Sequence, residues 1–203
     1  MSDYQFKDHL EEFSYSLGLT ISSNLIQSGV KEIDSLQFLA GLQDTFAGNK
    51  PKISMDDANH ILQEFMLASN EEEANRNLEE GLLYLLNNIH NEGVVETESG
   101  LQYKVLKEGY GESPTIDDQI KCNYHGIQLD GTVFDSSVER RQPAIFPVNA
   151  VVQGWAEALL LMSVGAKWRL FIPSNLAYGE EGAGGLIGPN ATLIFDVELL
   201  EII

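Results

Sequence analysis

The most informative stretch of this chain is NYHGIQLDGTVFDSS, residues 123–137. It places aromatic residues, glycines and Asp135 in a fixed order. The order continues in three later motifs, which are VVQGW at 151–155, PSNLAYG at 173–179 and LIFDVELL at 193–200. Aromatic and aliphatic side chains more often build a core than a binding site. What these motifs build therefore depends on the secondary structure around them.

The C-terminal half of the chain has the pattern of a β-sheet domain. After Gly93 the apolar residues recur with a period of two or irregularly, which is typical of strands. The predicted strands are residues 101–106, 120–124, 167–172 and 192–199. One helix is predicted near residues 154–160. We therefore expect an α+β domain over residues 94–203, with an antiparallel twisted β-sheet wrapped on one short helix.

The first half of the chain is predicted to be all-helical. One helix carries an apolar stripe with steps of four, three, four and four, formed by Phe6, Leu10, Phe13, Leu17 and Ile21. A second helix is predicted after Asp34, and it ends near Gly48-Asn49.

A long connecting helix is predicted over residues 54–91. Ser54 and Asp57 resemble a capping box, and the next glycine is Gly81. The alternative is two helices with a joint near Ser69-Asn70, because Asn70 followed by three glutamates is a good N-cap signal. We favour the single helix. Residues 1–93 then form a helical domain that includes the long helix.

The apolar stripes of these helices predict an assembly. A bundle dominated by one long rod cannot bury so much apolar surface, so a homodimer through the N-terminal helices is expected, with two-fold symmetry. Two alternatives stay open. The helices can fold back onto the C-terminal domain of their own chain, or they can form a docking domain for a different protein.

Composition excludes several classes of partner. The 203 residues carry 31 acidic and 12 basic side chains, a net charge of −19, so a nucleic-acid partner is not expected. No run of 18 apolar residues occurs, and we expect no membrane span. The N-terminus has no signal-peptide pattern and the chain has one cysteine, Cys122. We expect a cytoplasmic protein, or a periplasmic one if a leader has been removed.

The usual catalytic and metal-binding motifs are missing from the sequence. The four histidines are scattered without metal-ligand spacing, so we expect neither a metal nor a cofactor. There is no GxSxG motif and no P-loop. The glycines between Gly179 and Gly188 predict a long exposed turn between two strands. Cys122 has no basic neighbour in the sequence, which favours inert packing over a role as a nucleophile.

In their order and spacing, the motifs between residues 99 and 203 resemble the FKBP-type peptidyl-prolyl isomerases. The resemblance implies an apolar pocket that receives a proline ring. Trp155 would form its floor. The implied walls are Tyr124, Phe134 and Phe195, and the implied rims are Val151, Val152, Leu186 and Ile187, with Phe146 also in the substrate-binding set.

The resemblance also implies a few polar groups at this pocket. The Tyr178 hydroxyl and the backbone N–H of Val152 would bond the carbonyls of a ligand. Asp135 would be the single pocket carboxylate, tied to the Tyr124 hydroxyl and to Arg140. The alternative for Asp135 and Arg140 is an ion pair that only holds a loop in place.

Three positions depart from the family pattern at the rim. Ala144 stands where many relatives carry an aromatic residue, Ala183 where they carry histidine, and Leu186 where isoleucine is commoner. These changes leave the floor intact. They bear on macrolide binding and on the preference for the residue before proline.

The implied activity is acceleration of X–Pro isomerisation, with proline-containing unfolded or partly folded polypeptides as partners and macrolides as possible ligands. The alternative is a peptide-binding chaperone module of the same fold with little turnover. The first half resembles the N-terminal helical domain of the dimeric bacterial members, of the macrophage-infectivity-potentiator and FkpA type. That resemblance rests on Ser16-Leu17-Gly18, the end of the helix at Gly48, and Glu92-Gly93-Val94. It implies a homodimer with chaperone activity.

Overall fold

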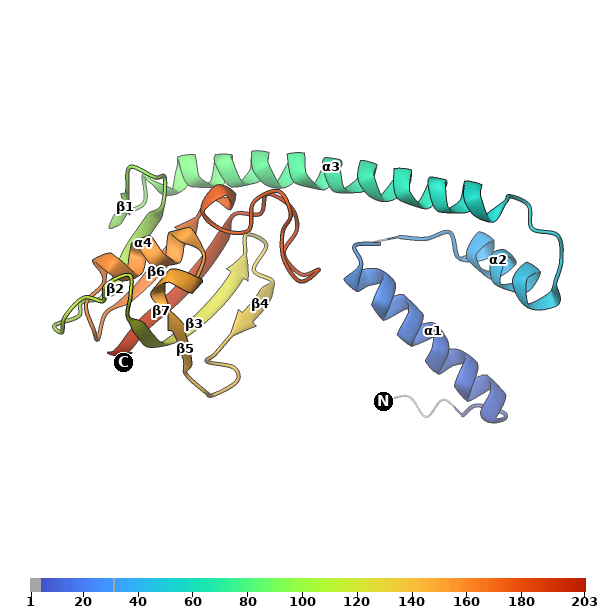
Figure 1. The fold of residues 1–203 in the computed structure, drawn as a ribbon, viewed down its shortest axis with the longest axis horizontal. Coiled ribbons are helices and arrows are strands. Elements are labelled where there is room, and N and C mark those ends of the chain that lie inside the picture. The colour runs from blue at the N-terminus through green and yellow to red at the C-terminus, as the bar shows by residue number, and fades with distance from the viewer. Residues whose placement is uncertain (1–4, 31) are drawn as a thin grey trace. The chain divides into compact units, whose positions relative to one another are not determined.

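The computed structural model describes residues 5–30 and 32–203 (Figure 1). By its internal contacts the chain separates into two compact units, residues 1–69 and residues 70–203. The division falls inside helix α3 (Met55–Asn88). The boundary expected after residue 93, from the change of sequence pattern, coincides with the start of strand β1 (Val94–Glu96).

Helices α1 (His9–Gln27) and α2 (Ser35–Ala47) begin at aspartate caps. The Asp8 carboxylate accepts hydrogen bonds from the backbone N–H groups of Leu10 and Glu11, each at 2.9 Å. Asp34 caps α2 in the same way, and α2 ends at Gly48 with a φ of 67°. The second helix is therefore as predicted. The prediction for the first was wrong at its start, because the cap places Phe6 before the helix.

Helix α3 is one continuous helix of 34 residues, which confirms the favoured prediction over a joint near Ser69-Asn70. At its start the Ser54 hydroxyl accepts the Asp57 N–H at 3.0 Å and donates to the Asp57 carboxylate at 2.7 Å. This cap departs from the predicted capping box, in which that carboxylate would bond the backbone N–H of Ser54. No helix in the described ranges is long and apolar enough to cross a lipid bilayer.

The strands of the described residues form one antiparallel sheet in the order β1-β2-β6-β7-β3-β4, and β5 pairs with β3 beside β4 (Figure 1). Their bounds are β2 Gln102–Lys107, β3 Gln119–Gln128, β4 Val133–Ser136, β5 Ala144–Pro147, β6 Lys167–Ile172 and β7 Leu193–Ile202. The sequence predicted β6 with these same bounds and predicted β3 and β7 too short. It missed β1, β4 and β5, which have only three or four residues each.

The two faces of the sheet are covered by different helices. On one face, α4 (Gln153–Leu161) buries Trp155 and Leu159 in the main core. On the other face, the end of α3 packs Leu85 against Phe171 and Ile194. Neighbouring residues of a strand point to opposite faces, so Phe171 and Ile194 face α3 while the residues beside them face α4.

Two buried polar or reactive groups in this unit have structural roles. The Gln102 amide donates to the Leu85 carbonyl at 3.0 Å and accepts from Asn88 at 2.9 Å, which ties α3 to the sheet. Cys122 is fully buried on β3, and burial raises its pKa to about 12. Its thiol is therefore protonated and inert, as the sequence predicted.

Candidate active site

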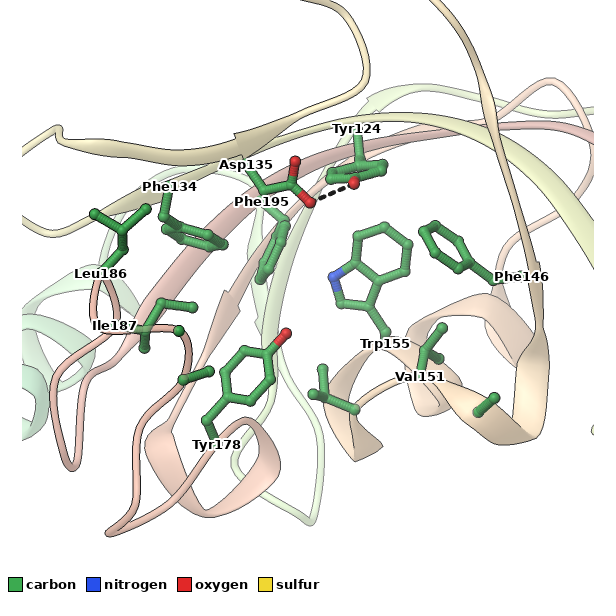
Figure 2. Close-up of a pocket in the computed structure, with 14 residues that line it drawn as sticks. Tyr124, Phe134, Asp135, Phe146, Val151, Trp155, Tyr178, Leu186, Ile187 and Phe195 are labelled. Carbon is green, nitrogen blue, oxygen red and sulfur yellow. Dashed lines mark hydrogen bonds between the residues drawn. The ribbon is translucent and has the colours of Figure 1, made fainter. Parts of the chain in front are cut away.

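A cavity of about 440 Å³ lies between the sheet and the start of α4, a size typical of small-ligand sites (Figure 2). Segments far apart in the sequence meet there: β3, β4, β7, α4 and the loop before β7. The lining residues are Tyr124, Phe134, Asp135, Phe146, Ala150, Val151, Val152, Trp155, Tyr178, Ala183, Gly184, Leu186, Ile187 and Phe195. The set holds every proposed site residue except Arg140, and it adds Ala150, Ala183 and Gly184.

Trp155 lies among three other aromatic rings. Its indole is only 4% exposed and meets Tyr124, Phe146 and Phe195 edge to face, with centroid distances of 5.4, 6.0 and 5.2 Å. Perpendicular pairs are the favoured arrangement, since the positive edge of one ring meets the negative face of another. The floor is therefore held by mutual packing and has little freedom to move.

Gly126 is a part of the site whose role the sequence reasoning missed. It lies on β3 opposite Phe195 of β7 and Asp135 of β4. A Cβ at this position would lie 2.7 Å from Cζ of Phe134 and 2.8 Å from Cε1 of Phe195. The absent side chain thus makes room for two of the walls. A glycine inside a strand pattern is the signal that could have identified it.

Gly126→Ala is expected to destabilise the fold by about 1–3 kcal/mol, as overpacking does, and to lower kcat/KM because Phe134 and Phe195 must shift. Chemical denaturation and a peptide isomerisation assay would measure the two effects. Gly41→Ala in α2 is the matched control, since nothing lies within 4 Å of its Cβ position. Equal stability of the two variants would contradict the expectation.

The polar side of the pocket is a cluster of three side chains. The Tyr124 hydroxyl donates to Asp135 Oδ2 at 2.5 Å (Figure 2). Arg140 forms an ion pair with Asp135 and donates from Nη2 to the Tyr124 hydroxyl at 2.7 Å. Arg140 does not line the cavity itself, so the structure places it behind the two residues that do. Its contacts tie the segment after β4 to Asp135 and Tyr124.

These contacts fix the charges of the site. Burial tends to raise the pKa of Asp135, but hydrogen bonds from Tyr124 and Arg140 and the Arg140 charge outweigh it, so the pKa lies below its ordinary value. Burial, with the bond to Asp135, raises the pKa of Tyr124. Burial and the Asp135 charge raise the pKa of Tyr178. Near neutral pH the carboxylate is ionised and both phenols keep their protons.

Two donors are available to a ligand at the mouth of the pocket. The Tyr178 ring points its hydroxyl into the space beside Trp155 and Phe195 (Figure 2). Val152 is the N-cap residue of α4. Within residues 5–30 and 32–203, its backbone N–H has no acceptor. Both groups are therefore candidate donors for hydrogen bonds to a ligand.

We expect kcat/KM to stay constant within about twofold from about pH 5 to about pH 9. Asp135 stays ionised over this range because its pKa is lowered, and Tyr124 and Tyr178 stay protonated because theirs are raised. Activity should fall only when the pH drops far enough to protonate Asp135. A pH series, with the uncatalysed rate subtracted at each point, measures this. A tenfold change near neutrality would contradict it.

The chemistry open to this pocket is narrow. Its described lining holds one carboxylate and no cysteine, histidine, lysine or serine. Among the residues that the structure describes, no group of three or more acidic, histidine or cysteine side chains is placed to hold a metal. Fold and site together define an apolar pocket on an antiparallel sheet, with the Tyr178 hydroxyl and the Val152 N–H as its donors.

Comparison with known proteins names the family. Residues 111–200 match the family of FKBP-type peptidyl-prolyl cis-trans isomerases, and residues 10–105 match the domain amino terminal to them. The chain is 45% identical to the FKBP-type 22 kDa peptidyl-prolyl cis-trans isomerase of Escherichia coli K12, covering 94% of each. It is 40% identical to the isomerase Mip of Coxiella burnetii, covering 97% of this chain and 88% of Mip.

A solved structure agrees over the same length. The crystal structure of FkpA from Escherichia coli matches with a TM-score of 0.71 and 35% identity, covering 98% of each chain. The chain belongs to the FKBP-type peptidyl-prolyl cis-trans isomerases with an amino-terminal helical domain. It is an isomerase of X–Pro peptide bonds.

Proposed function

We propose that this isomerase acts on unfolded and partly folded polypeptides, as a homodimer with chaperone activity. The observation that carries the proposal is the pocket itself. It has an aromatic floor and walls, two donors at its mouth, and no group that changes charge near neutral pH. Such a site suits a reaction that consists of rotation about one bond.

Rotation about an X–Pro bond is slow because the twisted state loses amide resonance, at a barrier of about 18–20 kcal/mol. The carbonyl is less polar in the twisted state than in the planar one, and water stabilises the planar state better. Burying the proline ring on Trp155 removes water from the bond. This favours the twisted state, and only interactions that are stronger in that state accelerate the step.

The donors hold the peptide while the bond turns. Tyr178 would bind a carbonyl on one side of the rotating bond, and the Val152 N–H would bind a carbonyl on the other side. The proline ring would then lie against the aromatic floor. Asp135 and Arg140 would contribute by fixing the Tyr124 wall. No proton is removed from the substrate, so the absence of a general base from the described lining is consistent with this mechanism.

The N-terminal unit supports the homodimer. Leu10, Phe13 and Leu36 are 71%, 63% and 76% exposed, and Phe46 is 84% exposed. Helix α2 contains no buried residue at all within its bounds. Exposed apolar surface on this scale is unusual for a soluble monomer and marks an interaction face. A second copy of the same unit would cover it with two-fold symmetry.

Two pockets in one assembly support the chaperone activity. A client held at one pocket meets the second at a high effective concentration, which strengthens binding without any new kind of contact. The homodimer would therefore retain long unfolded chains better than short peptides. An enzyme without this property would treat both substrates alike.

The test combines two substrates. The wild-type chain should accelerate isomerisation of an X–Pro tetrapeptide, followed by a protease-coupled assay, and the refolding of a client whose slow step is proline isomerisation. The whole proposal would be supported if client refolding is accelerated at a lower enzyme concentration than the isomerisation of the tetrapeptide requires. Peptide rates equal to the uncatalysed reaction, together with client binding, would instead favour a binding module with little turnover.

A further inference from the structure

One side of the pocket is a loop rich in glycine, residues 179–189, which we name the rim loop. Five of its eleven residues are glycine. It supplies Ala183, Gly184, Leu186 and Ile187 to the cavity lining. Inside the loop, Ala183 and Ile187 exchange backbone hydrogen bonds of 2.9 and 3.0 Å. Glycine-rich backbone has many accessible conformations, so the position of this loop depends on contacts from outside it.

Helix α3 supplies such contacts, although it does not line the cavity. The Asn77 side chain donates from Nδ2 to the Pro189 carbonyl at 2.8 Å, across 112 positions of sequence. At Gly188 a Cβ would lie 2.6 Å from Oε1 of Glu73 and 3.0 Å from Nδ2 of Asn77. The side chains of the helix therefore lie directly against the end of the rim loop.

The contact continues along one stripe of the helix. Gly81 lies one turn beyond Asn77, and a Cβ there would lie 2.3 Å from Oγ1 of Thr192, just before β7. Residues 73, 77 and 81 are spaced by four, so they share one face of α3. That face of α3 therefore lies along the segment that runs from the end of the rim loop, at Gly188, to Thr192 just before β7.

A second side chain holds the rim loop from the sheet. Gln128, at the end of β3, donates from Nε2 to the Leu186 carbonyl at 2.7 Å. The segment that enters the pocket, residues 183–187, thus has one amide anchor at Leu186 and a second just after it at Pro189. The Leu186 side chain is 59% exposed, so packing of this side chain adds little to these anchors.

The geometry points to Asn77 as a positioning residue that sets the rim loop and thereby the selection of the residue before proline. The inference rests on the isomerase pocket proposed above. Asn77 is not one of the residues that line that pocket, and it acts through its bond to Pro189. It belongs to the region that matches the amino-terminal domain. That domain therefore takes part in substrate choice as well as in assembly.

The test compares full-length variants on two tetrapeptides that differ only before the proline, with leucine or alanine there. Asn77→Ala should lower kcat/KM for the leucine peptide by about 3- to 10-fold, the worth of one hydrogen bond. The loss should lie mainly in KM. The alanine peptide should change by less than about twofold, because a methyl group offers little side chain for the rim loop to contact. Asn75→Ala, an exposed position on the same helix, is the matched control.

A second readout follows the loop directly. Hydrogen exchange at the Ile187 N–H, which donates to Ala183, should be faster in Asn77→Ala than in Asn75→Ala. Gln128→Ala should reproduce both effects and replaces Asn77→Ala if that variant does not fold. No loss, or an equal loss for both peptides, would overturn the inference. An inactive wild-type chain would instead overturn the proposed function.

Discussion

Asp135→Ala is expected to lower kcat/KM for X–Pro peptides by about 10- to 50-fold, at nearly unchanged stability. The substitution removes the acceptor of the Tyr124 hydroxyl and the partner of Arg140. The Tyr124 hydroxyl then keeps only its bond from Arg140, and the Arg140 charge loses its ion-pair partner. Both changes act on the rotating bond. Steady-state kinetics on a tetrapeptide series measures the loss.

The matched control is Asp117→Ala, which removes an exposed aspartate that does not line the pocket. It should keep wild-type kinetics. Asp135→Asn separates charge from shape, since the amide still accepts a bond from Tyr124 but no longer pairs with Arg140. If the activity of Asp135→Ala stays within twofold of the wild type, the expectation is wrong. The ion pair between Asp135 and Arg140 would then only hold a loop in place.

Leu10→Asp combined with Leu17→Asp is expected to convert the proposed homodimer into a monomer. Both side chains belong to one stripe of α1 and are 71% and 41% exposed. Charges placed there would be buried without partners in an interface, at a cost of several kcal/mol. Sedimentation should show about 45 kDa for the wild type, twice the 22.5 kDa chain, and about half of that for the variant.

The control adds the same two charges to the other side of α1, as Ser16→Asp with Ser23→Asp, and should leave the dimer intact. The apolar-stripe variant should keep its kcat/KM on tetrapeptides and lose its advantage on a refolding client. A wild-type monomer at micromolar concentration would contradict the homodimer. It would leave the fold-back arrangement or a docking domain as the explanation for the apolar helices.

Periodicity predicted the larger elements of the fold and failed on the small ones. Strand β6 and helix α2 have strong patterns and clear ends, and both were predicted closely. Strands β4 and β5 have four residues each, too few for alternation to stand out from the loops around them. Phe6 continues the spacing of the α1 stripe, but the cap at Asp8 makes the helix begin after Phe6. Spacing alone contains no information about caps.

The site was predictable as a set of residues and not as an arrangement. The order of the aromatic motifs, through the family resemblance, brought together the floor and walls that the structure places in one cavity. Nothing in the sequence indicated that Asp135 lines the cavity while Arg140 does not. The bond between Asn77 and Pro189 spans two predicted domains. Contacts of that kind depend on tertiary packing, which local patterns do not encode.

The edges of the sheet have a consequence for the proposed action on unfolded chains. One edge is β1, with three residues, and the other is shared by β4 and β5, with four residues each. Unfolded polypeptides carry many unpaired backbone groups that add readily to a long, open strand. Short edges offer them little to pair with. The sheet therefore offers little template for the aggregation of such segments.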